Sequence, residues 1–122
     1  MPRVFTPKDA NTILPEVKQI LRDIRVATEE AGSSSNEMTR TSRLKLKELF
    51  ERLESLGCIV RDISIGLIDF PANRLGRPVF LCWKLDEPAV THWHGEQEGF
   101  LARRTVVEAE FEQVAQLPAY IV

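Results

Sequence analysis

The sequence predicts an α+β fold, with an N-terminal antiparallel helical hairpin followed by a three- to four-stranded antiparallel meander sheet. Two observations favour this class. Apolar residues recur with helical spacing before Gly57, and short runs of strand-like alternation follow it. The 122 residues are expected to form a single domain, 1–122. Its parts are the helical hairpin (1–57), the sheet with a polar cluster (58–105) and a short helix or tail (106–122).

The first helix begins at a clear N-terminal signal. Thr6 stands at the N-cap, Pro7 at the first helical position and Asp9 three residues after the cap, as in a capping box. The apolar face then comprises Ala10, Ile13, Leu14, Val17, Ile20, Leu21 and Ile24. Because this face keeps its phase across Pro15, we predict one kinked helix, with two separate helices as the alternative.

A loop of small polar residues at 31–36 precedes the second helix, which we predict from Glu37 to Leu56. Its apolar face comprises Met38, Ser42, Leu46, Leu49, Phe50, Leu53 and Leu56. Gly57 stands where a left-handed C-terminal cap is expected. Two helices joined by a short loop form an antiparallel hairpin.

Strand signals follow the second helix. Short β-like runs cover 58–60 and 67–70, and Pro71 is expected to end the second because proline cannot donate to a ladder. We predict a loop at 73–78 and an alternating strand from Val79 to Leu85. After a turn at 86–88, residues 89–94 are predicted as a further strand. A tight turn there places Cys82 opposite His92 and Phe80 opposite His94.

This register gathers a polar cluster. His92 and His94 are two residues apart, so on a strand both leave the same face. Imidazole, thiolate and carboxylate on one face is the chemistry of a transition-metal site, and His92, His94 and Glu96 are candidate ligands for zinc or manganese. The alternative is that both histidines are ordinary strand residues.

Asp69 interrupts an apolar run, and a buried carboxylate needs a partner. Arg103, Arg104 or a backbone amide are candidates for that partner, in a structural or a functional role. We expect Asp69 and His94 on one face of the sheet with a cation, Arg103, nearby. The catalytic candidates are therefore Asp69, His94 and Arg103.

Composition excludes several classes of function. A net charge of -2 and a pI of about 5.7 disfavour nucleic-acid binding. No apolar run approaches the ~18 residues that cross a bilayer, so we expect no membrane partner and a cytoplasmic location. The two cysteines are too few for a disulfide scaffold.

Several motifs in order resemble the bacterial domain-of-unknown-function family 2203: Phe5-Thr6, Leu14-Pro15-Glu16-Val17, Gly66 to Pro71, Leu81 to Leu85, Trp93-His94 and Arg103. The resemblance implies a small bacterial cytoplasmic protein and no mechanism. The position of His92 is often aromatic in that family, which favours Asp69, His94 and Arg103 over a two-histidine site.

We therefore expect a self-associating binding or interaction module. The alternative is a metal- or small-molecule-dependent enzyme that uses the Asp/His/Arg cluster. A first helix of about 36 Å exceeds a four-stranded sheet about 15–20 Å wide. The overhanging apolar face predicts a homodimer through the helical hairpin.

Overall fold

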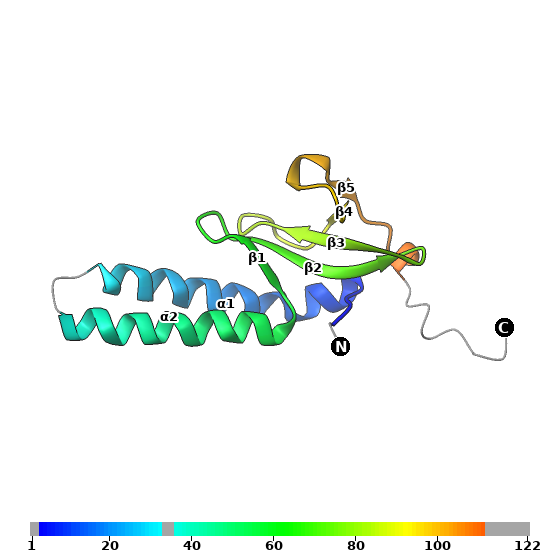
Figure 1. Ribbon diagram of the computed structural model, residues 1–122. Helices are drawn as coiled ribbons and strands as arrows, with labels where there is room; N and C mark the ends of the chain where they lie inside the picture. Colours follow the sequence, from blue (N-terminus) through cyan, green and yellow to red (C-terminus); the bar gives the residue numbers. More distant parts are fainter. Residues whose placement is uncertain (1–2, 33–35, 112–122) are drawn as a thin grey trace.

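The computed structural model describes residues 3–32 and 36–111. A helical hairpin packs against one face of an antiparallel sheet (Figure 1). The elements are α1 (Pro7–Ala31), α2 (Asn36–Leu56), β1 (Ile59–Asp62), β2 (Leu67–Arg74), β3 (Arg77–Trp83), β4 (His92–Gly95) and β5 (Arg104–Thr105). Short 3-10 helices cover Phe100–Ala102 and Glu108–Phe111. This arrangement confirms the predicted α+β class.

The N-terminal capping box of α1 is present as predicted. The Asp9 amide donates to the Thr6 hydroxyl, and the Thr6 amide donates to the Asp9 carboxylate, both at 3.1 Å. The helix runs through Pro15 to Ala31 without a break, so the alternative of two separate helices is wrong. Gly57, with φ of 95°, follows α2 in the left-handed conformation expected of a C-terminal cap.

The sheet has one strand more than predicted. Its order is β1-β2-β3-β4-β5, with every neighbouring pair antiparallel. The added strand β5 pairs with β4 through Thr105 and Arg104. Two residues were too short a pattern to detect in the sequence.

The prediction that Pro71 ends the second strand is wrong, because β2 continues to Arg74 and pairs Pro71 with Phe80. Phe5 lies along the edge of β2 that β3 leaves free, where it bridges Ala72. The Phe5 amide donates to the Pro71 carbonyl at 2.7 Å. The nitrogen and carbonyl of a strand residue point to the same side, so the missing N–H of Pro71 removes no hydrogen bond to β3.

The loop predicted at 73–78 is a two-residue hairpin turn. Leu75 and Gly76 have φ angles of 51° and 83°, which are the positive values that a type I′ turn requires. The strand predicted at 89–94 instead covers His92–Gly95. The Val90 amide donates to the Asn11 side chain at 2.8 Å, and the Val90 carbonyl accepts from it at 3.2 Å, so this part of the chain is bonded to α1.

Side-chain alternation separates two environments. The inner face of the sheet contributes Ile68, Phe70, Ala72, Val79, Leu81 and Trp83 to the core beneath the helices. The outer face, away from the helices, carries Asp69, Cys82 and His94, which are also buried. The polar cluster therefore lies on the face that the hairpin does not cover.

The hairpin extends beyond the β1–β2 turn (Figure 1). The 25 residues of α1 span about 37 Å. Within the single chain, however, the apolar face of α1 is already covered as far as Ala27, which is 3% exposed, and α2 packs along α1. The overhang therefore leaves less apolar surface for a partner than its length alone predicts.

The end of the described chain also packs on the sheet. Phe111 is 1% exposed and meets Trp93 edge-to-face at 6.5 Å between ring centroids. Within the short helix or tail predicted at 106–122, the structure has the 3-10 helix Glu108–Phe111, and residues 112–122 lie outside the described residues. Across 3–32 and 36–111, neither α-helix has an apolar stretch of the length that crossing a membrane requires.

Gly66 makes a close contact in the β1–β2 turn, and Gly76 in the β2–β3 turn provides a comparison without such a contact. Gly66 has φ of +65°, and a Cβ there would lie 2.6 Å from the Leu85 Cβ. Gly76 has φ of +83° and would meet nothing within 4 Å. We expect Gly76→Ala to lower the free energy of unfolding by about 1–2 kcal/mol from backbone strain alone. The loss for Gly66→Ala should be at least about 1 kcal/mol larger.

Urea unfolding followed by circular dichroism measures both losses. Equal losses for the two variants would show that the turn relaxes away from Leu85 at no cost.

Candidate functional site

Three adjacent strands bring Asp69 (β2), Cys82 (β3) and His94 (β4) together. Asp69 pairs directly with Cys82, and the predicted register of Cys82 with His92 and of Phe80 with His94 is present. One potential ligand atom from each of Asp69, Cys82 and His94 lies within 4.8 Å of the other two. The three residues are only 1–3% exposed. The sheet therefore builds a buried group of imidazole, thiol and carboxylate.

The hydrogen bonds of His94 determine which ring nitrogen carries a proton. Its Nδ1 lies 2.9 Å from the Gly95 carbonyl oxygen, which only accepts, so Nδ1 must donate. Its Nε2 lies 2.9 Å from Asp69 Oδ2. A neutral ring with its proton on Nδ1 would turn a lone pair toward the carboxylate. A proton or a metal ion must therefore lie between Nε2 and Oδ2.

The Asp69 carboxylate is only half satisfied. Oδ2 accepts from His94 and also from Arg61 Nε, at 2.8 Å. Oδ1 is buried and has no hydrogen-bond partner among the described residues. A buried carboxylate oxygen without a donor is costly, and such atoms call for a specific explanation. The neighbouring Cys82 thiol, which interacts with Asp69, or a cation held at Oδ1 supplies one.

Arg61 reaches this cluster from a β-bulge. The register passes from Val60 opposite Ile68 to Asp62 opposite Leu67, which leaves Arg61 as the extra residue. Bulges redirect side chains and are common beside functional sites. The guanidinium also stacks over the Phe80 ring, at 4.8 Å from its centroid. Arg61 is thus held at the edge of the cluster by a charge and by a ring.

Burial raises the pKa of the Cys82 thiol to about 12, and the charge of Asp69 adds to this effect, whereas the Arg103 guanidinium opposes it. Without a metal ion, Cys82 is therefore a neutral thiol. Burial likewise raises the pKa of Cys58 to about 12, but Cys58 belongs to the hydrophobic core.

A pocket of about 310 Å³ opens over the cluster. Besides the three clustered residues it is lined by Arg61, Leu67, Glu96, Glu98, Gly99 and Phe100. Glu98 holds the loop after β4 in place, since it accepts from the Gly95 amide at 2.8 Å and pairs with Arg104 at 2.7 and 2.9 Å. The hydrogen bond from Arg104 is the main reason that the pKa of Glu98 falls to about 2. The pocket thus has a fixed wall and an open mouth.

The structure brings together some of the predicted residues and not others. Asp69 and His94 meet, as expected, but the cation on Asp69 is Arg61. Arg103 forms a two-point ion pair with Glu87, at 2.9 and 2.5 Å, so it is not the partner of Asp69. Its guanidinium does lie beside Cys82, and the expectation of Arg103 near the cluster is met in that form.

Of the three predicted metal ligands, only His94 belongs to the buried cluster. Glu96 lines the pocket, whereas His92 does not and its Nδ1 lies 2.9 Å from the Thr91 hydroxyl. Among the described residues, the group of close ligand atoms consists of His94 with Asp69 and Cys82, without His92 or Glu96. Cys82 was placed on the correct face by its strand register. Arg61 was missed because no pattern in the sequence marks a bulge.

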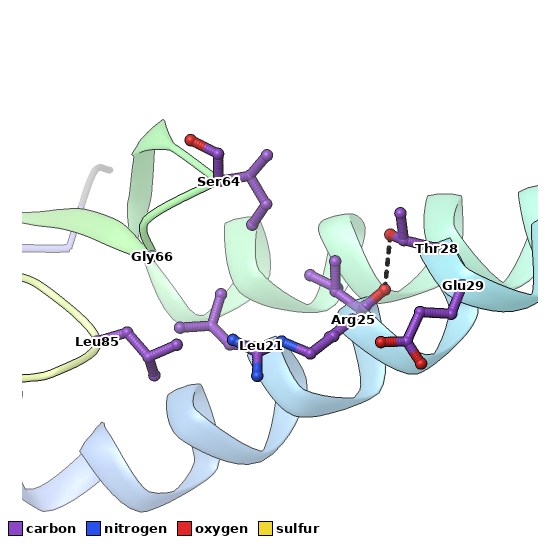
Figure 2. A pocket seen from close by; sticks show the side chains of 9 residues that line it. Leu21, Arg25, Thr28, Glu29, Ser64, Gly66 and Leu85 are labelled. Carbon is purple, nitrogen blue, oxygen red and sulfur yellow. Dashed lines mark hydrogen bonds between the residues drawn. The ribbon is translucent and has the colours of Figure 1, made fainter. Parts of the chain in front are cut away.

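A second pocket of about 360 Å³ lies between α1 and the β1–β2 turn. Figure 2 shows Ser64 and Gly66 of the turn on one side, Leu85 on another, and Leu21 and Arg25 of α1 along the floor. The Thr28 hydroxyl is already bonded to the Ile24 carbonyl at 2.7 Å. The other lining residues are Ile24, Thr28, Glu29 and Ile63, so this pocket brings together no set of metal ligands.

Fold and site together define a small α+β protein with a buried Asp-Cys-His group on the outer face of its sheet. Residues 3–106 match the family described as "Uncharacterized conserved protein (DUF2203)", and the chain belongs to this family. No curated protein and no solved structure matches the chain.

The thiols provide a test of this geometry. Both cysteines are at most 5% exposed and have a raised pKa, so the native protein should react only slowly with Ellman's reagent at pH 8. The protein unfolded in guanidinium should release two thiols rapidly. Fast reaction of one thiol in the native protein would contradict the described burial.

Proposed function

We propose that the chain binds a divalent ion of the zinc class through Asp69, Cys82 and His94, and that it acts on a small molecule in the pocket above them. One observation carries the proposal. The Gly95 carbonyl holds the proton of His94 on Nδ1 and turns Nε2 toward Asp69. Metal-bound histidines have this arrangement, with the second ring nitrogen donating to a carbonyl.

The spacing of the three groups supports the same conclusion. Ligand atoms around a tetrahedral zinc ion lie about 3.3–3.8 Å apart. The three candidate atoms are within 4.8 Å of one another, so side-chain shifts of about an ångström are sufficient. Three protein ligands leave a fourth position open, as in catalytic rather than structural zinc sites.

The donor set favours zinc over manganese, because thiolate and imidazole are softer ligands than manganese prefers. A bound ion would displace the thiol proton of Cys82, and the nearby Arg103 charge favours the resulting thiolate. Reducing compartments keep unpaired thiols available as ligands, which supports a cytoplasmic location.

The open position is where chemistry would occur. Zinc lowers the pKa of a bound water and polarises a bound oxygen. Around that position the chain offers Arg61 as a cation and Glu96 as a carboxylate that makes no ion pair within the described residues. These side chains can orient a substrate and accept a proton, which supports a metal-dependent enzyme over a purely structural site.

Cobalt(II) titration tests the proposal. We expect wild-type protein to bind cobalt with a thiolate-to-cobalt charge-transfer band in the near ultraviolet. Cys82→Ser should abolish that band, and His94→Gln should weaken binding at least tenfold because each removes a ligand. Zinc should displace cobalt with one equivalent per chain.

His92→Gln is the matched control, since His92 lies on the same strand outside the cluster. It should bind cobalt like the wild type. Weak cobalt binding that is equal in wild type and His94→Gln would refute the proposal.

Self-association is a second proposal, favoured by one observation. Ile63 and Ile65 in the β1–β2 turn are 40% and 48% exposed, and Ile63 lines the apolar pocket of Figure 2. Two-fold pairing through this turn and the neighbouring hairpin would cover these side chains in both copies.

Light scattering at micromolar concentration tests the homodimer. We expect a mass of twice 13.9 kDa for the wild type and a shift toward 13.9 kDa for Ile65→Glu. Leu101→Glu is the control, because Leu101 is 99% exposed and lies elsewhere. A wild-type mass of 13.9 kDa would exclude the dimer.

A further inference from the structure

We propose that the ligand of the pocket is a small organic carboxylate with an apolar body. Its carboxylate would bind at the open metal position and to the outer nitrogens of Arg61. This inference rests on the proposed metal site and assigns the class of molecule that the site takes.

The orientation of Arg61 is the first argument. Its Nε donates to Asp69, and no hydrogen bond to either terminal nitrogen is found within the described residues. The side chain is 42% exposed and lines the pocket, while the Phe80 ring beneath it restrains its plane. A guanidinium with one edge anchored and two outer nitrogens free suits a planar carboxylate.

Charge is the second argument. A divalent ion with ionised Asp69 and Cys82 is neutral, and Arg61 adds one positive charge, which the Glu96 carboxylate on the rim balances. Glu98 adds no free charge because Arg104 neutralises it. Glu96 remains on the rim without an ion pair among the described residues and repels anions of higher charge. A singly charged carboxylate is therefore favoured over phosphate.

The lining supplies the third argument. Leu67 and Phe100 contribute apolar surface to the same pocket, so the ligand is expected to carry an apolar body. A volume of about 310 Å³ lies at the lower end for ligand pockets, which limits the ligand to a small molecule.

Cobalt-loaded protein tests the inference, with benzoate as the probe, benzyl alcohol as its neutral counterpart, and inorganic phosphate as the competing anion. We expect benzoate to shift the visible cobalt bands and to bind more tightly than phosphate. Benzyl alcohol should leave the bands unchanged. Arg61→Gln should weaken benzoate binding about tenfold to a hundredfold, as expected for lost hydrogen bonds to a charged group. Arg77→Gln, at an exposed arginine on β3, is the control and should bind as the wild type does.

Arg61→Gln could also change cobalt loading, because it removes the cation beside Asp69. Two further variants address this. Arg61→Lys retains a cation for Asp69 but lacks the fork, so it should load cobalt and bind benzoate more weakly than the wild type. Glu96→Gln removes the rim charge and should strengthen phosphate binding more than benzoate binding.

The outcomes separate the two proposals. If wild-type protein does not bind cobalt, the proposed metal site fails and the carboxylate inference fails with it. If cobalt binds but benzoate causes no shift, or binds equally to wild type and Arg61→Lys, the metal site stands and the carboxylate inference is overturned. Phosphate binding more tightly than benzoate would also overturn it.

Discussion

The hydrogen bond between His94 Nδ1 and the Gly95 carbonyl is the constraint on which the proposed chemistry depends. The carbonyl accepts only, so the ring must donate through Nδ1 and present Nε2 to Asp69 at 2.9 Å. Without this contact the ring could take the other tautomer and, while neutral, donate from Nε2 to the carboxylate. With it, a proton or a metal ion is required between Nε2 and the carboxylate oxygen.

The fold provides this constraint through its two layers. The helical hairpin and the inner face of the sheet form the core, which frees the outer face for polar residues. Alternation along β2, β3 and β4 then places Asp69, Cys82 and His94 on that outer face. The loop after β4 lines the pocket over them through Glu96, Glu98 and Gly99, and the ion pair of Glu98 with Arg104 secures it. The cluster is thereby buried on a face that has no helical layer.

Much of this arrangement was predictable from the sequence. The capping box at Thr6 predicted the start of α1, and the period-two pattern with the turn at 86–88 predicted the opposition of Phe80 and His94. Both features are determined by residues close to one another in the chain, so a local sequence pattern is sufficient to predict them. The prediction that Pro71 ends β2 failed because the effect of a proline depends on which edge of the strand its nitrogen faces. Here that edge is the one bonded to the distant residue Phe5.

The charged partner of Asp69 could not be predicted from local sequence patterns. Arg103 is a reasonable partner by composition, yet its guanidinium pairs with Glu87, and a one-residue bulge in β1 delivers Arg61 instead. Ion pairs between distant segments depend on register and on side-chain direction, which a bulge changes without any sequence signature. The sequence therefore predicted that Asp69 and His94 meet, but neither the charged partner of Asp69 nor the full set of close ligand atoms.

Nitrogen-15 NMR of the His94 ring, with and without zinc, tests the central claim most directly. We expect Nδ1 to keep its proton throughout, whereas Nε2 should move to the resonance of a metal-bound, unprotonated nitrogen when one equivalent of zinc is added. The His92 ring serves as an internal reference and should not respond. A ring that keeps a proton on Nε2 in the presence of zinc would contradict the account.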